Sequence, residues 1–186
     1  MTNIILASSS ATRAALLKKA GVKFRVVKSS YREHMDTKKT PRMLARYLAY
    51  QKALSVAKKY PNALVIGADT LMVLDGKAYG KPRNERDHRA MLKKMSGRRH
   101  TMVTGVAIIG YSGSEKIFSR ETHVTFRKLS EQEIKKYVVL GEGKIAAGGY
   151  RILRGAKKFV KRTLGGIDTV AGLPLRETLE LLSRMR

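Results

Sequence analysis

The sequence predicts a mixed α/β fold, in which a sheet of parallel and antiparallel strands is flanked by helices. Two strand-like segments near the start are each followed by a helical pattern, then a run of strand-like segments follows, and helical patterns close the chain. Alternating strands and helices indicate parallel pairing, whereas successive strands joined by short turns indicate hairpins. At 186 residues the chain has the size of one ordinary domain, so residues 1–186 are predicted to form a single domain.

The first strand and helix enclose a serine-rich turn. Residues 3–6 are apolar, residues 7–10 read Ala-Ser-Ser-Ser, and residues 11–20 follow a helical pattern that stops at Gly21. A strand, a polar turn and a helix N-terminus aim backbone N–H groups at an anion, and Arg13 lies one turn inside the helix. The alternative is that these serines only cap the helix.

The second strand, residues 24–27, leads through a polar segment into a long helix. The helix is expected from Thr40, as N-cap, and Pro41 to about Lys59. Its apolar stripe is expected at Met43, Leu44, Tyr47, Leu48, Leu54 and Ala57. Lys52 then lies away from the centre of that stripe, where most lysines are solvated.

An apolar run at residues 63–68 ends on Asp69. An ionised carboxylate is costly inside a buried strand, so Asp69 is expected where the strand emerges, which is also where open α/β sheets bind ligands. A capping or turn role is the alternative, because aspartate is common in both.

The remaining elements follow in order. Residues 71–82 predict a hairpin around Asp75-Gly76 with a loop beyond it, and residues 141–150 are too rich in glycine for a regular element. The other expected elements are a helix at 84–96 stopped by Gly97, strands at 100–110 and 116–126 joined by a turn at 112–114, a helix opened by a capping box at Ser130–Glu133 and running to Leu140, a strand near 159–160, and a last helix after Gly172-Leu-Pro174 with Leu175, Leu179 and Leu182 on one face.

The composition favours a protein that binds phosphates. The 39 Lys and Arg residues against 14 Asp and Glu give a net charge of +25. Such an excess indicates an anionic ligand, nucleotide or nucleic acid, but the cations are spread along the chain without a basic tail or a nucleic-acid motif. Nucleic acid is therefore possible as a partner but is not favoured.

Other classes are excluded by what is missing from the sequence. Without cysteine there are no disulfides and no thiolate ligands, and the four histidines do not form an i,i+4 pair. The start resembles no signal peptide, and no apolar run has the roughly 20 residues of a membrane helix. We therefore expect a cytoplasmic protein with no membrane partner.

Several motifs together resemble the Maf (septum-formation-inhibitor-like) nucleoside triphosphate pyrophosphatases. They are Leu6-Ala-Ser-Ser-Ser-Ala-Thr-Arg13, Gly67-Ala-Asp-Thr70 and Gly172-Leu-Pro-Leu175, with Glu33, Leu48-Ala-x-x-Lys52-Ala53, Gly80-Lys81-Pro82, His100 with Val103-Thr-Gly105, and Ala147-Gly-Gly-Tyr150 between them. The match covers nearly the whole chain in one order, and the family's fold implies an elongated, twisted mixed sheet flanked by helices.

The resemblance implies hydrolysis of a nucleoside triphosphate to the monophosphate and pyrophosphate with a divalent cation, Mg²⁺ or Mn²⁺. It also implies a homodimer, because the family often forms dimers. Asp69 would act as base and metal ligand, and Glu33 would join it on the metal. The substrate-binding residues would be Ser8, Ser10, Arg13, Lys52 and Lys81.

Three positions bear on base preference. The branch that prefers dTTP and UTP usually has Arg, Thr and Gln where this chain has Thr12, Thr70 and Leu153, and Ala146 replaces a family lysine. Ala-Asp-Thr fits this branch better than the 7-methyl-GTP branch. The alternatives are a non-enzymatic nucleic-acid-binding or cell-division (septum formation) regulatory protein, and a family member that has lost activity.

Overall fold

The computed structural model describes residues 3–36 and 38–185; Met1, Thr2, Thr37 and Arg186 lie outside the described residues. The chain divides into two compact units. Unit 1 comprises Met1–Asp69, Thr104–Arg120 and Gly172–Arg186, and unit 2 comprises Thr70–Val103 and Glu121–Ala171. The predicted single domain has not been tested and stays a prediction.

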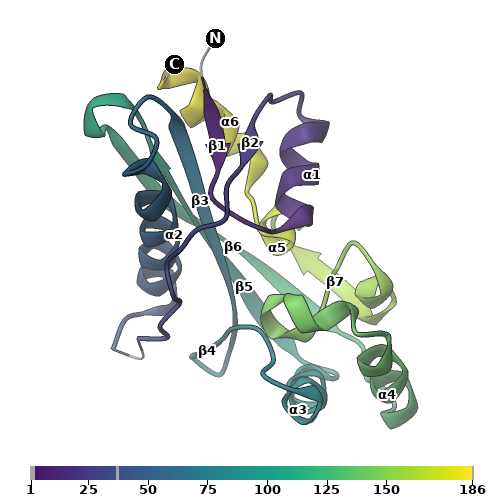
Figure 1. The fold of residues 1–186 in the computed structure, drawn as a ribbon. Coiled ribbons are helices and arrows are strands. Elements are labelled where there is room, and N and C mark those ends of the chain that lie inside the picture. The colour runs from purple at the N-terminus through teal and green to yellow at the C-terminus, as the bar shows by residue number, and fades with distance from the viewer. Residues whose placement is uncertain (1–2, 37, 186) are drawn as a thin grey trace. The chain divides into compact units, whose positions relative to one another are not determined.

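The helices and strands follow the predicted order closely (Figure 1). They are β1 (Ile4–Leu6), α1 (Ala11–Lys19), β2 (Arg25–Val26), α2 (Pro41–Ala57), β3 (Leu64–Leu74), β4 (Lys77–Tyr79), α3 (Glu85–Met95), β5 (Arg99–Ile109), β6 (Glu115–Phe126), α4 (Glu131–Leu140), β7 (Val160–Leu164), α5 (Ile167–Ala171) and α6 (Leu175–Arg184). Short 3₁₀ turns lie at Tyr111–Gly113, Glu142–Ile145, Ala147–Gly149 and Gly155–Phe159.

The strands form a mixed sheet. Among the described residues the order is β2-β1-β3-β5-β6-β7, and β4 pairs with β3. β1 is parallel to both β2 and β3, whereas β4 is antiparallel to β3 and β7 is antiparallel to β6. A mixed sheet flanked by helices, the predicted class, is therefore confirmed.

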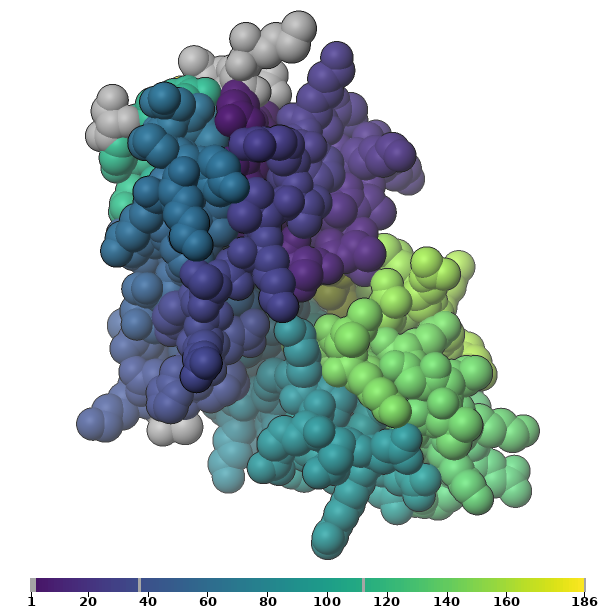
Figure 2. All heavy atoms as spheres, viewed as in Figure 1, coloured from purple at the N-terminus to yellow at the C-terminus, as the bar shows by residue number. Residues whose placement is uncertain are grey.

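In unit 1, helices cover both faces of the sheet. Alternate side chains of β1 point to opposite faces, so Ile4 and Leu6 pack with α1 and α6, while Ile5 and Ala7 pack with α2. In the space-filling view, purple and blue atoms of the N-terminal segments form much of the visible face of this unit (Figure 2). The predicted face of α6 is confirmed, since Leu182 is buried and Leu175 and Leu179 pack against the same core.

Helix α2 lies unusually close to the sheet. A Cβ atom on Gly67 would lie 2.2 Å from the Ala49 carbonyl oxygen, and one on Gly105 would lie 2.3 Å from that of Ala45. Only glycine in the strands allows this approach, because any side chain would overlap helix backbone. Helix and sheet are thus in backbone contact.

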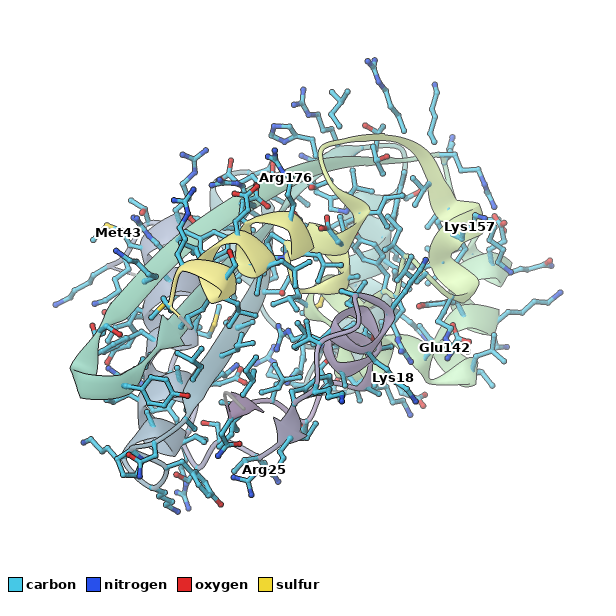
Figure 3. The ribbon with its side chains drawn as sticks, turned by 90° about the horizontal axis from the view of Figure 1, so that it is seen from above. Lys18, Arg25, Met43, Glu142, Lys157 and Arg176 are labelled. Carbon is cyan, nitrogen blue, oxygen red and sulfur yellow. The ribbon has the colours of Figure 1, made fainter. Side chains whose placement is uncertain are left out.

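The expected apolar stripe of α2 was partly wrong. The buried face consists of Leu44, Ala45, Leu48, Ala49, Lys52, Ala53 and Val56. Met43, labelled in Figure 3, and Tyr47 are instead 51% and 38% exposed. The small alanines face the sheet because of the close approach at the two glycines, and this turns Lys52 toward the sheet and not toward solvent.

Unit 2 has its own core. Its buried side chains include Met72 of β3, Leu92 of α3, Phe126 of β6, Tyr137 of α4 and Phe159. The predicted hairpin turn at Asp75-Gly76 is confirmed, with positive φ at both residues, and the capping box at Ser130 and Glu133 is present.

Two details of unit 2 differ from the prediction. Residues 141–150 are not free of regular structure, because they form two 3₁₀ turns, and the short helix α5 was missed. In the part of the chain that the structure describes, no helix combines the length and the apolar character that crossing a membrane requires.

Candidate functional site

Asp69 does not lie where a strand ends, and this expectation was wrong. β3 continues through Asp69 to Leu74, and Asp69 is only 5% exposed. The strand that ends near Asp69 is β1, the parallel neighbour of β3, because its pairing with β3 stops at Leu6 opposite Ile66. The chain leaves the sheet at Ser8, so Asp69 follows shortly after the last parallel pair. The buried carboxylate is tolerated because a cation pairs with it.

That cation is Lys52, which projects from the buried face of α2. Its Nζ makes a short hydrogen-bonded ion pair with Asp69 Oδ1 and lies 2.8 Å from Glu33 Oε1. Lys52 is 8% exposed. A single ammonium group therefore holds two carboxylates that are 36 positions apart in the sequence.

Glu33 reaches this position from the irregular segment after β2. The hydroxyls of Ser29 and Ser55 lie 2.9 Å apart, which ties the segment to α2 one turn beyond Lys52. The backbone N–H of Tyr31 also donates to Ser29 Oγ. The Glu33 side chain is 42% exposed, so the cluster extends from the buried Asp69 to solvent.

The serine-rich turn is built around Arg13. Ser10 is the N-cap of α1 and accepts from the Arg13 backbone N–H, so this serine caps the helix. Ser8 Oγ accepts from Arg13 Nη1 at 3.2 Å and from the Ser10 N–H at 3.2 Å. Arg13 Nε donates to the Gly172 carbonyl at 2.8 Å, which fixes the guanidinium in place.

The electrostatics join Arg13 to the carboxylates. Burial raises the pKa of Asp69, and the charges of Lys52 and Arg13 oppose that shift. Burial lowers the pKa of Arg13, while the charges of Asp69 and Glu33 raise it. Two carboxylates and two cations thus balance in charge, and a raised pKa makes Asp69 a better proton acceptor.

The structure therefore brings together most of the predicted residues of unit 1. Glu33, Lys52 and Asp69 are joined by ion pairs, and Arg13, which contacts Ser8, interacts electrostatically with both carboxylates. Thr12, on α1, is half-buried. Thr70, Lys81 and Leu153 belong to unit 2 and are described within that unit. Thr70 follows Asp69 on β3, Lys81 is exposed beyond β4, and Leu153 is 52% exposed.

Two contacts that position side chains of the site were not predicted from the sequence. The Gly172 carbonyl positions Arg13, and the Ser29–Ser55 contact positions the segment of Glu33. Gly172 was noted as the start of the last helix and of a family motif, without a role of its own. A main-chain carbonyl that accepts a hydrogen bond cannot be recognised from the pattern of side chains. Isolated serines are common on helix surfaces, so the two serines did not stand out.

Glu33 and Asp69 offer carboxylate oxygens that suit a hard divalent cation, and such a cation would also bind oxygens of the substrate. Glu33 and Asp69 both contact the same nitrogen atom, so the two carboxylates lie in one cluster. Among the described residues no group of three or more His, Cys, Asp or Glu could hold a metal. Mg²⁺ commonly binds to one or two carboxylates plus water and phosphate oxygens, which is the set available here.

Comparison with known proteins identifies relatives along almost the whole chain. The chain is 41% identical over 185 residues to a dTTP/UTP pyrophosphatase of Geobacillus sp. (strain WCH70), covering 100% of this chain and 99% of that protein. It is 39% identical to a dTTP/UTP pyrophosphatase of Symbiobacterium thermophilum, covering 99% and 94%.

A solved structure and a family model complete the comparison. The structure of a HAM1 protein from Coxiella burnetii matches with a TM-score of 0.52 and 13% identity, covering 99% of this chain and 100% of that chain, which shows a likeness of fold. The family model "Maf-like protein" matches residues 3–185. With its motifs, the ion-paired cluster and its relatives in agreement, the chain belongs to the Maf family.

Proposed function

We propose that this protein is a nucleoside triphosphate pyrophosphatase that hydrolyses its substrate between the α- and β-phosphates, releasing the monophosphate and pyrophosphate. The observation that carries the proposal is the cluster of Glu33, Lys52 and Asp69, three residues from separate segments joined in one ion-paired group. A structural ion pair of Lys52 and Asp69 would not need the half-exposed carboxylate of Glu33 as a third member. The relatives named dTTP/UTP pyrophosphatases support the same reaction.

Asp69 has the properties of the general base. Its burial favours the neutral carboxylic acid over the carboxylate, so its affinity for a proton exceeds that of a solvent-exposed aspartate. It accepts a proton from the attacking water while Lys52, at hydrogen-bond distance, fixes the position of the accepting carboxylate.

Arg13 and the serine-rich turn bind the phosphates. Arg13 is fixed through Nε, and a guanidinium is the side-chain group best suited to bidentate binding of phosphate oxygens. The Ser8 oxygen accepts two hydrogen bonds, so its own proton is available for a phosphate oxygen. Ser10 and Lys81 are proposed as further phosphate ligands from their positions in the family motifs.

A divalent cation, Mg²⁺ or Mn²⁺, would be held by Glu33 and Asp69. When bound, it would offset the negative charge of the triphosphate. Within the cluster two carboxylates balance Lys52 and Arg13, so a bound cation would add positive charge next to the triphosphate. We propose that the enzyme acts in the cytoplasm, where its nucleotide substrates are made.

We propose dTTP and UTP as the preferred substrates, with weaker discrimination among bases than in relatives that carry the usual Arg, Thr and Gln. Thr70 is kept, but Thr12 and Leu153 cannot supply the same hydrogen bonds. A site that loses a hydrogen bond to a base discriminates less strongly against other bases. The kcat/KM values for a panel of nucleoside triphosphates would give this preference directly.

The deciding experiment measures pyrophosphate release with Mg²⁺ or Mn²⁺ in Asp69→Asn and in a matched control, Asp75→Asn. Loss of the base should lower kcat by about 10²- to 10⁴-fold. Asp75 lies at an exposed turn with φ of 51°, a conformation that asparagine adopts readily, so the control should keep full activity. Equal activity of the two variants would refute the role given to Asp69.

A further inference from the structure

Unit 2 contains a basic groove that the proposed reaction does not use. The groove encloses about 850 Å³ and is lined by Lys93, Ser96, Thr125, Arg127, Lys128 and Lys161, among other residues. These side chains come from the end of α3, from β6 and the segment after it, and from β7. The lining includes four cations and no carboxylate.

The walls of the groove are held together by backbone contacts. The Gly97 N–H donates to the Arg127 carbonyl at 3.1 Å, and the Arg127 N–H donates to the Phe159 carbonyl at 2.9 Å. Arg127 Nε also donates to the Lys158 carbonyl at 2.9 Å. The groove is thus preformed, and binding does not require these segments to become ordered.

The charge of the groove stays positive after its ion pairs are counted. Lys93 pairs with Glu131, and Arg127 pairs with Glu133. Lys128 and Lys161 make no ion pair within residues 3–36 and 38–185. Four cations against two carboxylates leave a local excess of two positive charges, so the groove has capacity for an anion.

The flanking sequence adds to this excess. Six basic residues and no acidic residue lie between Tyr150 and Asp168: Arg151, Arg154, Lys157, Lys158, Lys161 and Arg162. Arg154, Lys157, Lys158, Lys161 and Arg162 are all exposed. A groove continuous in sequence with such a segment suits a ligand with many negative charges in a row, not a single small anion.

The lining favours phosphates over an acidic protein surface. Protein interfaces usually depend on exposed aromatic or apolar anchors, but Phe126, the aromatic residue of the groove lining, is 1% exposed. Lysine, arginine, serine and threonine are the side chains that contact sugar and phosphate. The lack of an exposed aromatic ring among the lining side chains also excludes base stacking as the source of affinity.

We propose that this groove binds the sugar-phosphate backbone of nucleic acid without sequence preference. Binding depends on the cations of the groove, so it weakens steeply with salt. It is a second activity of the chain, independent of the catalytic roles of Asp69 and Lys52.

The test measures the affinity of the full chain for a short fluorescein-labelled DNA duplex of mixed sequence over a series of salt concentrations. Lys128→Ala/Lys161→Ala is compared with a charge-matched control, Lys58→Ala/Lys59→Ala, at two exposed lysines of unit 1. The groove variant should weaken binding and reduce the slope of log K against log salt by about 2, one phosphate contact per lysine. The control should retain the wild-type slope.

Three outcomes would overturn the proposal: no binding by the wild type, equal losses in the two double variants, or displacement by polyglutamate at the same charge concentration as by unlabelled DNA. The last would identify an acidic peptide as the ligand. Asp69→Asn separates this site from the enzyme, because it should lose pyrophosphate release and still bind DNA. Failure of either assay therefore does not affect the other.

Discussion

Lys52 is the residue on which the candidate site depends most. It pairs with two carboxylates and is almost fully buried. Replacing it with methionine keeps the aliphatic chain but leaves Asp69 buried without its partner, which typically costs about 3 kcal/mol or more. Lys52→Met should lower the free energy of unfolding by about that amount in urea denaturation. Lys58→Met, at an exposed position, is the control and should change it by less than about 0.5 kcal/mol.

His100 makes the stability of the protein depend on pH. It is 2% exposed, its Nε2 lies 2.9 Å from the Tyr150 hydroxyl, and burial lowers its pKa to about 4. The unfolded chain, with a histidine pKa of about 6.5, binds a proton more readily than the folded one. Stability is therefore highest above pH 6.5 and falls as the pH is lowered toward 4, by about 3 kcal/mol from this group.

The measurement is urea denaturation at several pH values between 4 and 7. His100→Gln keeps a hydrogen-bonding group near Tyr150 but does not titrate, so its stability should fall less steeply over this range than that of the wild type. His34→Gln, at an exposed position, should keep the wild-type slope. Parallel curves for the wild type and His100→Gln would contradict the assignment.

At this scale the sequence indicated which residues form the cluster but not how they meet. Family motifs pointed to Glu33, Lys52 and Asp69. The helical pattern placed Lys52 toward solvent, because a lysine is normally too costly to bury. Its burial becomes favourable only when Asp69 lies opposite, and that pairing depends on the packing of α2 on β3, which a linear pattern does not contain.

At the scale of elements, the contact of α2 with the sheet is the most sensitive feature. An added methyl group at Gly67 would meet the backbone of α2 at Ala49 and Ala53, which cannot move aside as a side chain can. Gly67→Ala should therefore lower the free energy of unfolding by about 3 kcal/mol or more. Ala53→Gly, which removes a methyl group from the same contact, should cost only about 1 kcal/mol. Thermal or urea denaturation of both variants gives the comparison.

Helix boundaries were the structural features that the sequence predicted best. Thr40 and Pro41 begin α2, and Ser130 begins α4, as their local hydrogen-bonding chemistry requires. The length of β3 was not predictable in the same way, because an aspartate within a strand indicates a strand end unless its partner is known. The five-residue helix α5 is too short for a periodic pattern to reveal.

For the whole molecule, we expect one cooperative unfolding transition. Three of the four boundaries between the units fall inside strands, namely β3, β5 and β6, so each unit contains part of three continuous strands. Loss of one unit would shorten these strands in the other. Scanning calorimetry should show a single peak with a calorimetric to van't Hoff enthalpy ratio of about 1. Two separated peaks would mean that the predicted single domain is wrong.

The homodimer also stays a prediction, and light scattering in solution would test it.

The ion-paired cluster also has a consequence for the stability of the fold when no divalent cation is bound. Lys52 pairs with both carboxylates, and Lys52 and Arg13 together balance their charge, so we expect the chain to fold without a divalent cation. A chelator such as EDTA should abolish turnover while leaving the melting temperature unchanged, and added Mg²⁺ should restore activity at once. The proposed metal dependence would then concern turnover alone and not the stability of the fold.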